Sequence, residues 1–346
     1  MTINLTNMYQ PLYRLTNKLL RNISTIERTY GQIESLHIPK KLELNLTKRN
    51  LIASSYASNR IEGNPLTLPE VTNLLLDDRV PVNRDEKEVV NYFSMLQNLS
   101  DFQSKQISVG LILEFHTKLM TGVDETAGII RNVKVVVGKY KEEKGNVSLR
   151  VKHDPPHHDR KSIKKDLDEL CIWINTNIDI PAVLLTGIFH HEFVYIHPFE
   201  DGNGRVCRLL TALLFIKHDY MINKYFVLDD YYDIDRQQYS DMLHSADSGD
   251  KTEWLEYYTD GVKFSLQGSL AKYREAITSL RIEEQPTPKE REVLKIIQEK
   301  HEVTSQMIVK LLKVSRQQAH ALLRGLMEKG LLGKKGKTKS SYYFIK

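Results

Sequence analysis

Along the first ~125 residues, hydrophobic side chains recur at mixed spacings of three and four, which is the period of an α-helix with one buried face. Glycines are few in this region. Thr67-Leu68-Pro69-Glu70 has the pattern of a capping box and predicts the start of a helix that runs through Leu76. The other predicted helices of this region are Leu5–Tyr30, Leu46–Ile61, Asp85–Leu99 and Val109–Leu119.

The pattern then changes from helical spacing to short runs of β-branched residues. Val133–Val137 and Val147–Val151 are such runs, and the segment Gly138–Asn146 between them is polar and contains glycine at both ends. This arrangement predicts a β-hairpin with a long polar loop.

Helical spacing returns after the predicted hairpin. Two of the later helices are largely apolar, so we expect them at the centre of the core. The five predicted helices are Ile163–Ile174, Pro181–Tyr195, Val206–His218, Asp235–Leu243 and Lys251–Leu266. A polar segment with two prolines, Arg281–Pro288, is typical of a linker. Beyond it the pattern predicts helices over Thr287–Lys300, Thr304–Leu312 and Ser315–Lys329, and then a two-stranded wing over Leu331–Ile345.

The composition is that of an ordinary globular protein of two or three domains, with 346 residues, 41% hydrophobic and 27% charged. The two cysteines, Cys171 and Cys207, form neither a disulfide framework nor a zinc motif. The N-terminal residues lack the pattern of a signal peptide, and no run is apolar enough to span a membrane. We therefore expect a cytoplasmic protein without a membrane partner.

Charge is unevenly distributed along the chain. From Ser305 to Lys346, ten lysines and arginines stand against one acid, Glu328, for a formal charge of +9. Since the whole chain carries +5, residues 1–304 carry −4. A basic C-terminal module on a mildly acidic body indicates a surface for nucleic acid or another polyanion.

The densest group of chemically capable residues is the run His197-Pro-Phe-Glu-Asp-Gly-Asn-Gly-Arg-Val-Cys-Arg208, between the two apolar helices. Gly202, Asn203 and Gly204 precede a helix, and such a turn directs backbone N–H groups and the helix dipole at an anion. Arg205 and Arg208 lie within the first turn of that helix, where two guanidinium groups suit a polyphosphate.

Two further residues of the run suggest phosphoryl chemistry. Asp201 stands next to the expected phosphate site, so a divalent cation, Mg²⁺, is its natural partner. His197 titrates near neutral pH and can take a proton from an attacking hydroxyl, while Phe199 is expected to anchor the loop in the core. Taken singly, each residue is more often structural, but their combination within twelve positions favours function.

This run resembles, at each fixed position, the signature His-x-Phe-x-Asp/Glu-Gly-Asn-Gly-Arg-x-x-Arg of the Fic family. The resemblance implies a mainly α fold: an all-helical core in which a short β-hairpin, the flap, covers the substrate groove. It also implies transfer of AMP from ATP to a Ser, Thr or Tyr hydroxyl of a protein, with this chain itself among the candidate targets. His197 would be the general base, Asp201 the Mg²⁺ ligand, and residues 202–205 and Arg208 the phosphate binders. Residues 127–131 resemble the family's Gly-x-x-Arg lead-in to the flap.

A second segment, Ser58-Asn59-Arg60-Ile61-Glu62-Gly63, resembles the Ser/Thr-x-x-x-Glu-Gly/Asn pattern of a Fic inhibitory helix, here expected over about residues 50–63. Ser58 and Glu62 share one helix face. The resemblance implies that Glu62 pairs with Arg205 and keeps ATP from its productive position. An isolated glutamate before glycine is otherwise most often a solvated surface acid.

The C-terminal residues resemble a winged helix-turn-helix, with Arg316, Gln317, Gln318, His320 and Arg324 on the polar face of its recognition helix. DNA is the expected partner, and a protein contact or homodimerisation is the alternative. The predicted divisions are an N-terminal helical region, 1–105; a catalytic core, 106–265; a helix and linker, 266–286; and the winged module, 287–346.

Three questions remain open from the sequence. The Asp235-Arg-Gln-Gln-Tyr239 segment departs from the family's Asn-Arg-x-x-Tyr pattern, so Tyr239 is a candidate contact to the nucleotide base and the base preference is undetermined. The chain could instead be a DNA-binding transcriptional regulator that uses the Fic core as a nucleotide sensor. It could also remove AMP, with Glu62 serving the reverse reaction.

Overall fold

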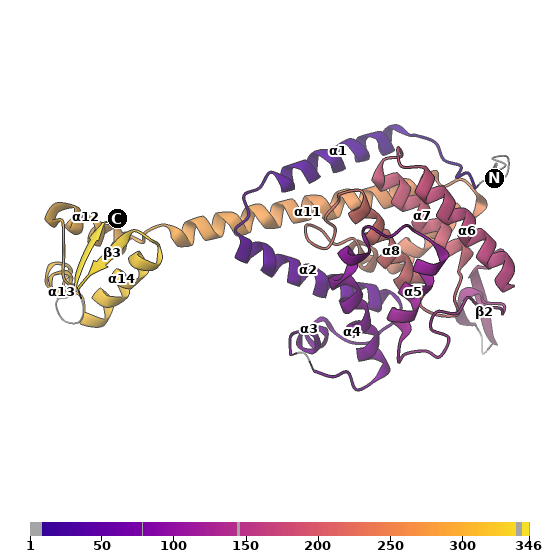
Figure 1. Cartoon of the computed structure of the whole chain (residues 1–346), viewed down its shortest axis with the longest axis horizontal. Coiled ribbons are helices and arrows are strands. Elements are labelled where there is room, and N and C mark those ends of the chain that lie inside the picture. The colour runs from indigo at the N-terminus through magenta and orange to yellow at the C-terminus, as the bar shows by residue number, and fades with distance from the viewer. Residues whose placement is uncertain (1–8, 78, 144–145, 337–340, 346) are drawn as a thin grey trace. The chain divides into compact units, whose positions relative to one another are not determined.

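A computed structural model describes residues 9–77, 79–143, 146–336 and 341–345. The chain divides into two compact units, an N-terminal unit, Met1–Ala271, and a C-terminal unit, Lys272–Lys346 (Figure 1). The division falls inside the long helix α11, Thr252–Glu284. This helix continues through the first four residues of the predicted linker, so the prediction that the linker begins at Arg281 is wrong.

Helices α7 (Ala182–Ile196) and α8 (Asn203–Lys217) form the centre of the N-terminal unit. Both are apolar on nearly all sides, which is the pattern of helices surrounded by protein. Gly187 of α7 lets α11 approach closely, since a Cβ there would lie 2.9 Å from side-chain carbons of Leu255 and Tyr258. The other helices of this part of the chain are α5 (Val109–Met120), α6 (Arg160–Thr176), α9 (Asp229–Ile234) and α10 (Arg236–Ser245).

The N-terminal helices surround this centre. Helix α1, Asn17–Glu34, runs beside α11 (Figure 1), and Asn22 donates from Nδ2 to Asp260 at 3.0 Å. Helix α1 begins twelve residues later than predicted, because Thr16 caps its first turn and residues 9–16 are not helical. The predicted start at Leu5 lies outside the described residues.

The next helices agree closely with the sequence pattern. At the predicted capping box, the Thr67 N–H donates to Glu70 at 2.8 Å at the start of α3. The helix that carries Ser58 begins earlier than predicted and ends at the predicted residue. The bounds are α2 (Lys40–Ile61), α3 (Leu68–Leu76), α4 (Arg84–Gln97) and a 3-10 turn η2 (Leu99–Phe102).

The predicted hairpin is present, but its first strand was placed too early. Strand β1, Val137–Glu143, pairs antiparallel with β2, Asn146–His153. Residues 138–143 and Asn146 of the predicted polar loop are therefore strand. The Val133 carbonyl accepts a hydrogen bond from Arg131 at 2.9 Å, which keeps this residue in the approach to the hairpin.

The C-terminal unit contains the predicted elements in the predicted order. They are α12 (Pro288–Lys300), α13 (Ser305–Leu312), α14 (Arg316–Glu328), β3 (Leu332–Lys335) and β4 (Tyr342–Ile345). Strands β3 and β4 pair antiparallel, and Val303 forms a further antiparallel bridge to Tyr343. A separate apolar core that includes Val293, Ile308 and Leu323 holds these elements together. Among the described residues, no helix is long and apolar enough to cross a membrane.

Candidate active site

The motif loop, His197–Gly202, joins α7 to α8 and is fixed by its own side chains. His197 and Gly202 both adopt left-handed backbone conformations, with φ of 50° and 79°. Asn203 holds the loop closed, because its Oδ1 accepts from the Phe199 N–H at 2.9 Å and its Nδ2 donates to the Phe199 carbonyl at 2.8 Å. Both polar ends of the Asn203 side chain are thus used within the loop.

His116 of α5 packs against the motif loop. Its ring stacks on fully buried Phe199 at 3.7 Å between centroids. Its Nδ1 accepts from the Gly128 N–H at 2.8 Å, so Nε2 carries the proton and donates to the Asp201 carbonyl at 3.1 Å. Burial lowers the pKa of His116, which favours this neutral form. Sequence reasoning missed His116, because an isolated histidine at the end of a helix carries no local signal.

Arg131 holds the backbone around His197. Its guanidinium, 1% exposed, donates to the carbonyls of His197 at 2.7 Å, His157 at 2.7 Å and Ile196 at 3.3 Å. The Arg131 N–H also donates to the Pro198 carbonyl at 3.0 Å. The Gly-x-x-Arg segment singled out in the sequence is thus a clamp that joins the approach to the hairpin to the motif loop.

His197 is arranged as a proton acceptor. Its Nδ1 faces the Val194 carbonyl at 3.3 Å. A carbonyl can only accept, so Nδ1 carries the proton and Nε2 keeps its lone pair. Burial, together with the nearby His153, lowers the pKa of His197 to about 3. The imidazole is consequently neutral across the physiological range and available to accept a proton.

Arg205 lies among acids at the mouth of the loop. Its guanidinium is 3.2 Å from Glu88 of α4 and 3.2 Å from Asp201. The other Asp201 oxygen accepts from Arg84 at 2.7 Å, and the Asp201 side chain is 39% exposed. Among the described residues, the buried Nε of Arg205 has no hydrogen-bond partner. A buried guanidinium with an unused donor is suited to an anionic ligand.

Glu62 pairs with Arg208, and the predicted pairing with Arg205 is wrong. The Arg208 guanidinium donates to Glu62 Oε1 at 2.7 Å, to the Ser58 hydroxyl at 2.7 Å and to the Ser58 carbonyl at 2.9 Å. Arg208 lies one turn further into α8 than Arg205, at the point where α8 meets the end of α2. The Arg205 guanidinium points instead towards Glu88 and Asp201 and forms no ion pair with Glu62.

Glu62 also lies directly over the glycine turn. A Cβ added to Gly204 would collide with Glu62 Oε1 and would lie 3.0 Å from an Arg208 nitrogen. The carboxylate therefore fills the space above the N-terminus of α8, where backbone N–H groups attract an anion.

A second, deeper acid supports Arg208. Asp229 Oδ1 lies 3.8 Å from the Arg208 Nε, and its other oxygen accepts a short hydrogen bond from Ser54. Burial raises the pKa of Asp229 to about 6, although Arg208 acts in the opposite direction. Burial is the largest single influence on Arg208 and lowers its pKa, but Glu62, Asp229 and neighbouring tyrosines together raise it more, so the net shift is upward.

Tyr239 is buried in the helical core. The ring is 5% exposed, stacks on Tyr232 at 4.2 Å, and its hydroxyl is 2.8 Å from His190 Nε2. Burial raises the pKa of Tyr239. The side chain is a core residue behind Arg208, and the structure does not support its prediction as a nucleotide contact.

The fold and the loop geometry agree with comparisons against known proteins. Residues 106–215 match the model of the Fic/DOC family. This part of the chain is a Fic domain, and it contains α5, the hairpin, the motif loop and nearly all of α8.

The full chain has more specific relatives. It is 25% identical to the protein adenylyltransferase fic-1 of Caenorhabditis elegans over 263 residues, which are 73% of this chain and 47% of the relative. It is 27% identical to the protein adenylyltransferase Fic of Drosophila mojavensis over 254 residues, 69% of this chain and 45% of that one. The chain thus spans about half the length of the curated relatives it matches.

Solved structures show the same fold. A Fic family protein from Desulfovibrio desulfuricans G20 superposes with a TM-score of 0.65 at 24% identity, and the match covers 98% of both chains. A fragment of Fic-1 from C. elegans superposes with a TM-score of 0.60 at 22% identity, over 75% of this chain and 73% of the fragment.

Proposed function

We propose that this protein is an autoinhibited adenylyltransferase that moves AMP from ATP to a hydroxyl of a protein. Two features next to each other in the chain carry the proposal. One is a neutral His197, whose Nε2 can accept a proton, and the other is an anion site formed by the start of α8, Arg205 and Arg208. The names of the relatives described above point to the same reaction class.

In the proposed reaction, the target hydroxyl gives its proton to His197 Nε2 as its oxygen attacks the α-phosphorus of ATP. The new bond joins that oxygen to phosphorus, and the bond from the α-phosphorus to the bridging oxygen breaks. Pyrophosphate leaves with the electron pair of that bond. The backbone N–H groups at the start of α8 and the two arginines stabilise the charge on the phosphates.

The residues present fit a magnesium ion. Asp201 offers an exposed carboxylate beside the glycine turn, and its present partner Arg84 is a half-exposed side chain on the first turn of α4. When bound there, Mg²⁺ would offset the repulsion between Asp201 and the triphosphate. Arg84 would then keep its second partner, Glu88, at 3.1 Å.

Glu62 would hold the site in an inactive state. Its carboxylate neutralises Arg208 and lies over Gly204, so a triphosphate cannot use either group fully while Glu62 remains. A small displacement of the phosphates is costly, because in-line attack requires close alignment of the reacting atoms. Release of Glu62 would therefore raise the rate of AMP transfer.

The experiment compares labelled AMP incorporation by the full chain and its variants, in the presence of a cell lysate, with ATP, GTP and CTP. We expect weak labelling by the unchanged chain, strong labelling by Glu62→Gly, and none by Glu62→Gly combined with His197→Ala. Glu292→Gly, at an exposed position of α12, is the matched control and should behave like the unchanged chain.

The outcomes separate the alternatives. Absence of labelling by Glu62→Gly with all three nucleotides would contradict the proposal. If the labelled product persists with Glu62→Gly and disappears when the unchanged chain is added, Glu62 serves AMP removal. Mass spectrometry of the labelled proteins identifies the transferred group and the modified hydroxyl.

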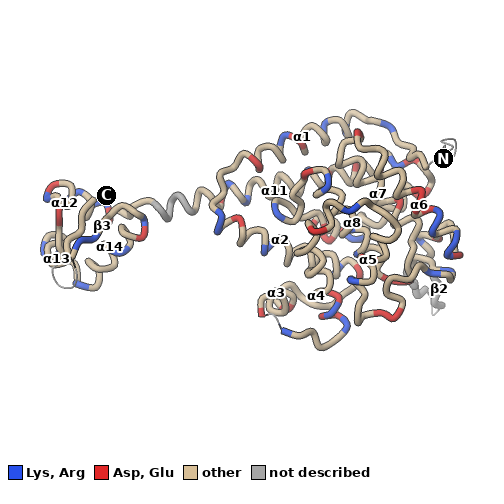
Figure 2. Tube along the Cα trace, viewed as in Figure 1, with Lys and Arg blue, Asp and Glu red and all other residues tan. Residues whose placement is uncertain are grey.

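We also propose a nucleic-acid surface on the C-terminal unit. Lys and Arg (blue in Figure 2) occur on α13, α14 and β3. A groove of about 630 Å³ lies over these elements. Its lining includes Arg316, His320, Arg324, Lys334, Ser341 and Tyr343. Arg316, His320 and Arg324 recur every four residues on the exposed face of α14, as contacts to a nucleic-acid backbone and base edges require.

A gel-shift series tests this surface with the full chain and random DNA duplexes at several salt concentrations. Arg316→Ala and Arg324→Ala should each weaken binding and reduce the slope of log affinity against log salt by about 1. Lys289→Ala, at an exposed position of α12, is the matched control. Absence of binding at low salt would rule out the DNA proposal and favour a protein partner or a second copy of the chain.

A further inference from the structure

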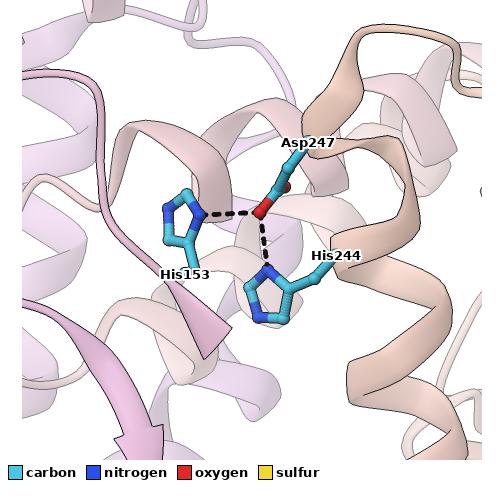
Figure 3. A group of neighbouring side chains, drawn as sticks. All are labelled: His153, His244 and Asp247. Atoms are coloured by element: carbon cyan, nitrogen blue, oxygen red, sulfur yellow. Dashed lines mark hydrogen bonds and ion pairs between the residues drawn. The ribbon is translucent and has the colours of Figure 1, made fainter. Parts of the chain in front are cut away.

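Three imidazoles converge on one carboxylate outside the motif loop. Asp247, in the 3-10 turn η3 (Ala246–Ser248), lies 2.7 Å from Nδ1 of His153 and 3.1 Å from Nδ1 of His244 through the same oxygen, Oδ2 (Figure 3). His191 approaches the other oxygen, Oδ1, at 3.0 Å. His153 is the last residue of β2, and His244 is near the end of α10, so the cluster ties the base of the hairpin to the helical core.

The outer nitrogen of His153 is already committed. Its Nε2 lies 2.9 Å from the Tyr195 carbonyl, which can only accept, so Nε2 carries a proton. The His153 side chain is buried, and its Nδ1 points at Asp247 Oδ2. A cation at Nδ1 would give each nitrogen of the ring a partner.

His244 is also oriented as a ligand would be. Nδ1 of His244 points at the same oxygen as Nδ1 of His153, and the two rings lie nearly parallel with 5.0 Å between their centroids. Two nitrogens and one carboxylate oxygen, all within 4.8 Å of one another, form a ligand set with room for one cation among them.

The surroundings resemble the outer shell of a metal site. Nδ1 of His191 accepts from the Lys251 ammonium at 2.8 Å, so its Nε2 carries the proton and donates to Asp247 Oδ1. This contact turns Oδ2 towards the two remaining histidines. Hydrogen bonds to the far side of each ligand are the usual means of fixing ligand orientation. Asp247 and His191 also line a surface cavity of about 240 Å³.

We propose that His153, His244 and Asp247 bind a divalent transition metal, with Zn²⁺ as the best match, and that this ion anchors the base of the hairpin. Two imidazoles and a carboxylate suit Zn²⁺, whereas Mg²⁺ and Ca²⁺ prefer oxygen ligands. Three protein ligands leave one position of a tetrahedral ion for water. None of these three residues belongs to the proposed magnesium site at Asp201, although the His153 ring lies 6.3 Å from the His197 ring, between centroids.

Calorimetric titration of the chelator-treated full chain with Zn²⁺ tests the proposal, with Mg²⁺ as the hard-cation control. We expect equimolar binding of Zn²⁺, an upward shift of Tm, and the intense visible absorption of tetrahedral Co²⁺ when cobalt replaces zinc. His244→Asn and Asp247→Asn should abolish all three signals. His191→Asn, which removes only an outer contact, should weaken Zn²⁺ binding about 10–100-fold.

His301→Asn is the matched control, because this histidine lies in the C-terminal unit in a left-handed turn that asparagine tolerates. Circular dichroism of each apo variant checks its folding, and the graded effect of His191→Asn provides a test even if one ligand variant unfolds. The proposal would be overturned if the unchanged chain did not bind Zn²⁺, or if His244→Asn and Asp247→Asn bound Zn²⁺ as tightly as the unchanged chain does. The cluster would then be a histidine–aspartate ion pair.

Discussion

Replacement of Arg131 by methionine removes the guanidinium that holds the motif loop and keeps most of the side chain's volume. In the structure this group makes three bonds of 2.7–2.9 Å to the carbonyls of His197, His157 and Val133. Among the described residues, no carboxylate forms an ion pair with it. The substitution therefore leaves carbonyl acceptors without a donor, and it leaves no unpaired acid behind.

The expected loss of stability follows from these bonds. Hydrogen bonds to a charged group contribute roughly 1.5–3 kcal/mol each, and a buried acceptor without a partner costs a further part of its desolvation. Because water can reach half-exposed His157, we expect a loss of about 3–5 kcal/mol in the free energy of unfolding for Arg131→Met. Arg131→Lys, which can satisfy only part of the set, should lie between.

Urea unfolding followed by tryptophan fluorescence measures this loss in the N-terminal unit, which contains Arg131. Both tryptophans of the chain, Trp173 and Trp254, are buried in the N-terminal unit, so the signal does not depend on the C-terminal unit. Arg49→Met, at an exposed position of α2, is the control. A loss below about 1 kcal/mol for Arg131→Met would refute the view that this guanidinium is a clamp.

Three further outcomes follow from the site. In the Glu62→Gly background, the rate of AMP transfer should not fall as pH drops through the ordinary histidine range, because His197 remains neutral until pH approaches its pKa of about 3; a loss of activity centred near 6.5 would contradict this. Asp229 has a folded pKa of about 6, above its unfolded value, so its contribution to stability is present below pH 4 and is lost as pH rises through 6; Asp229→Asn should remove that step from urea unfolding measured across pH. Ser58→Ala removes one acceptor from Arg208 and should cost about 1–2 kcal/mol in the same unfolding assay, with unchanged stability contradicting the assigned contact.

The sequence predicted the parts of the site that depend on neighbouring residues. The glycine turn, the helix that follows it and the capping box at Thr67 are local features, and each is present, although the helix begins at Asn203, three residues before the predicted start at Val206. The hairpin was predicted with a wrong first strand, because the β-branched run at Val133 has strand propensity, whereas pairing with β2 begins at Val137. Tertiary pairing overrides local propensity in such a segment.

The contacts that could not be predicted join residues far apart in the chain. Arg208 meets Ser58 across 150 positions, and His116 meets Asp201 across 85. Which of two arginines faces an acid depends on how α8 is rotated against α2 and α4, and no spacing within α8 contains that information. The same reason explains why the three histidines around Asp247 were not singled out.

The two acids beside Arg208 differ in a way that bears on activation. Glu62 is 31% exposed at the end of α2, whereas Asp229 is 11% exposed and is held by Ser54. Removal of Glu62 therefore leaves Arg208 with the two Ser58 contacts and with Asp229, so the guanidinium is not left as an unpaired buried charge. Release of Glu62 should expose one face of an arginine that stays in position for a phosphate. This is why we expect Glu62→Gly to activate the protein and to remain folded.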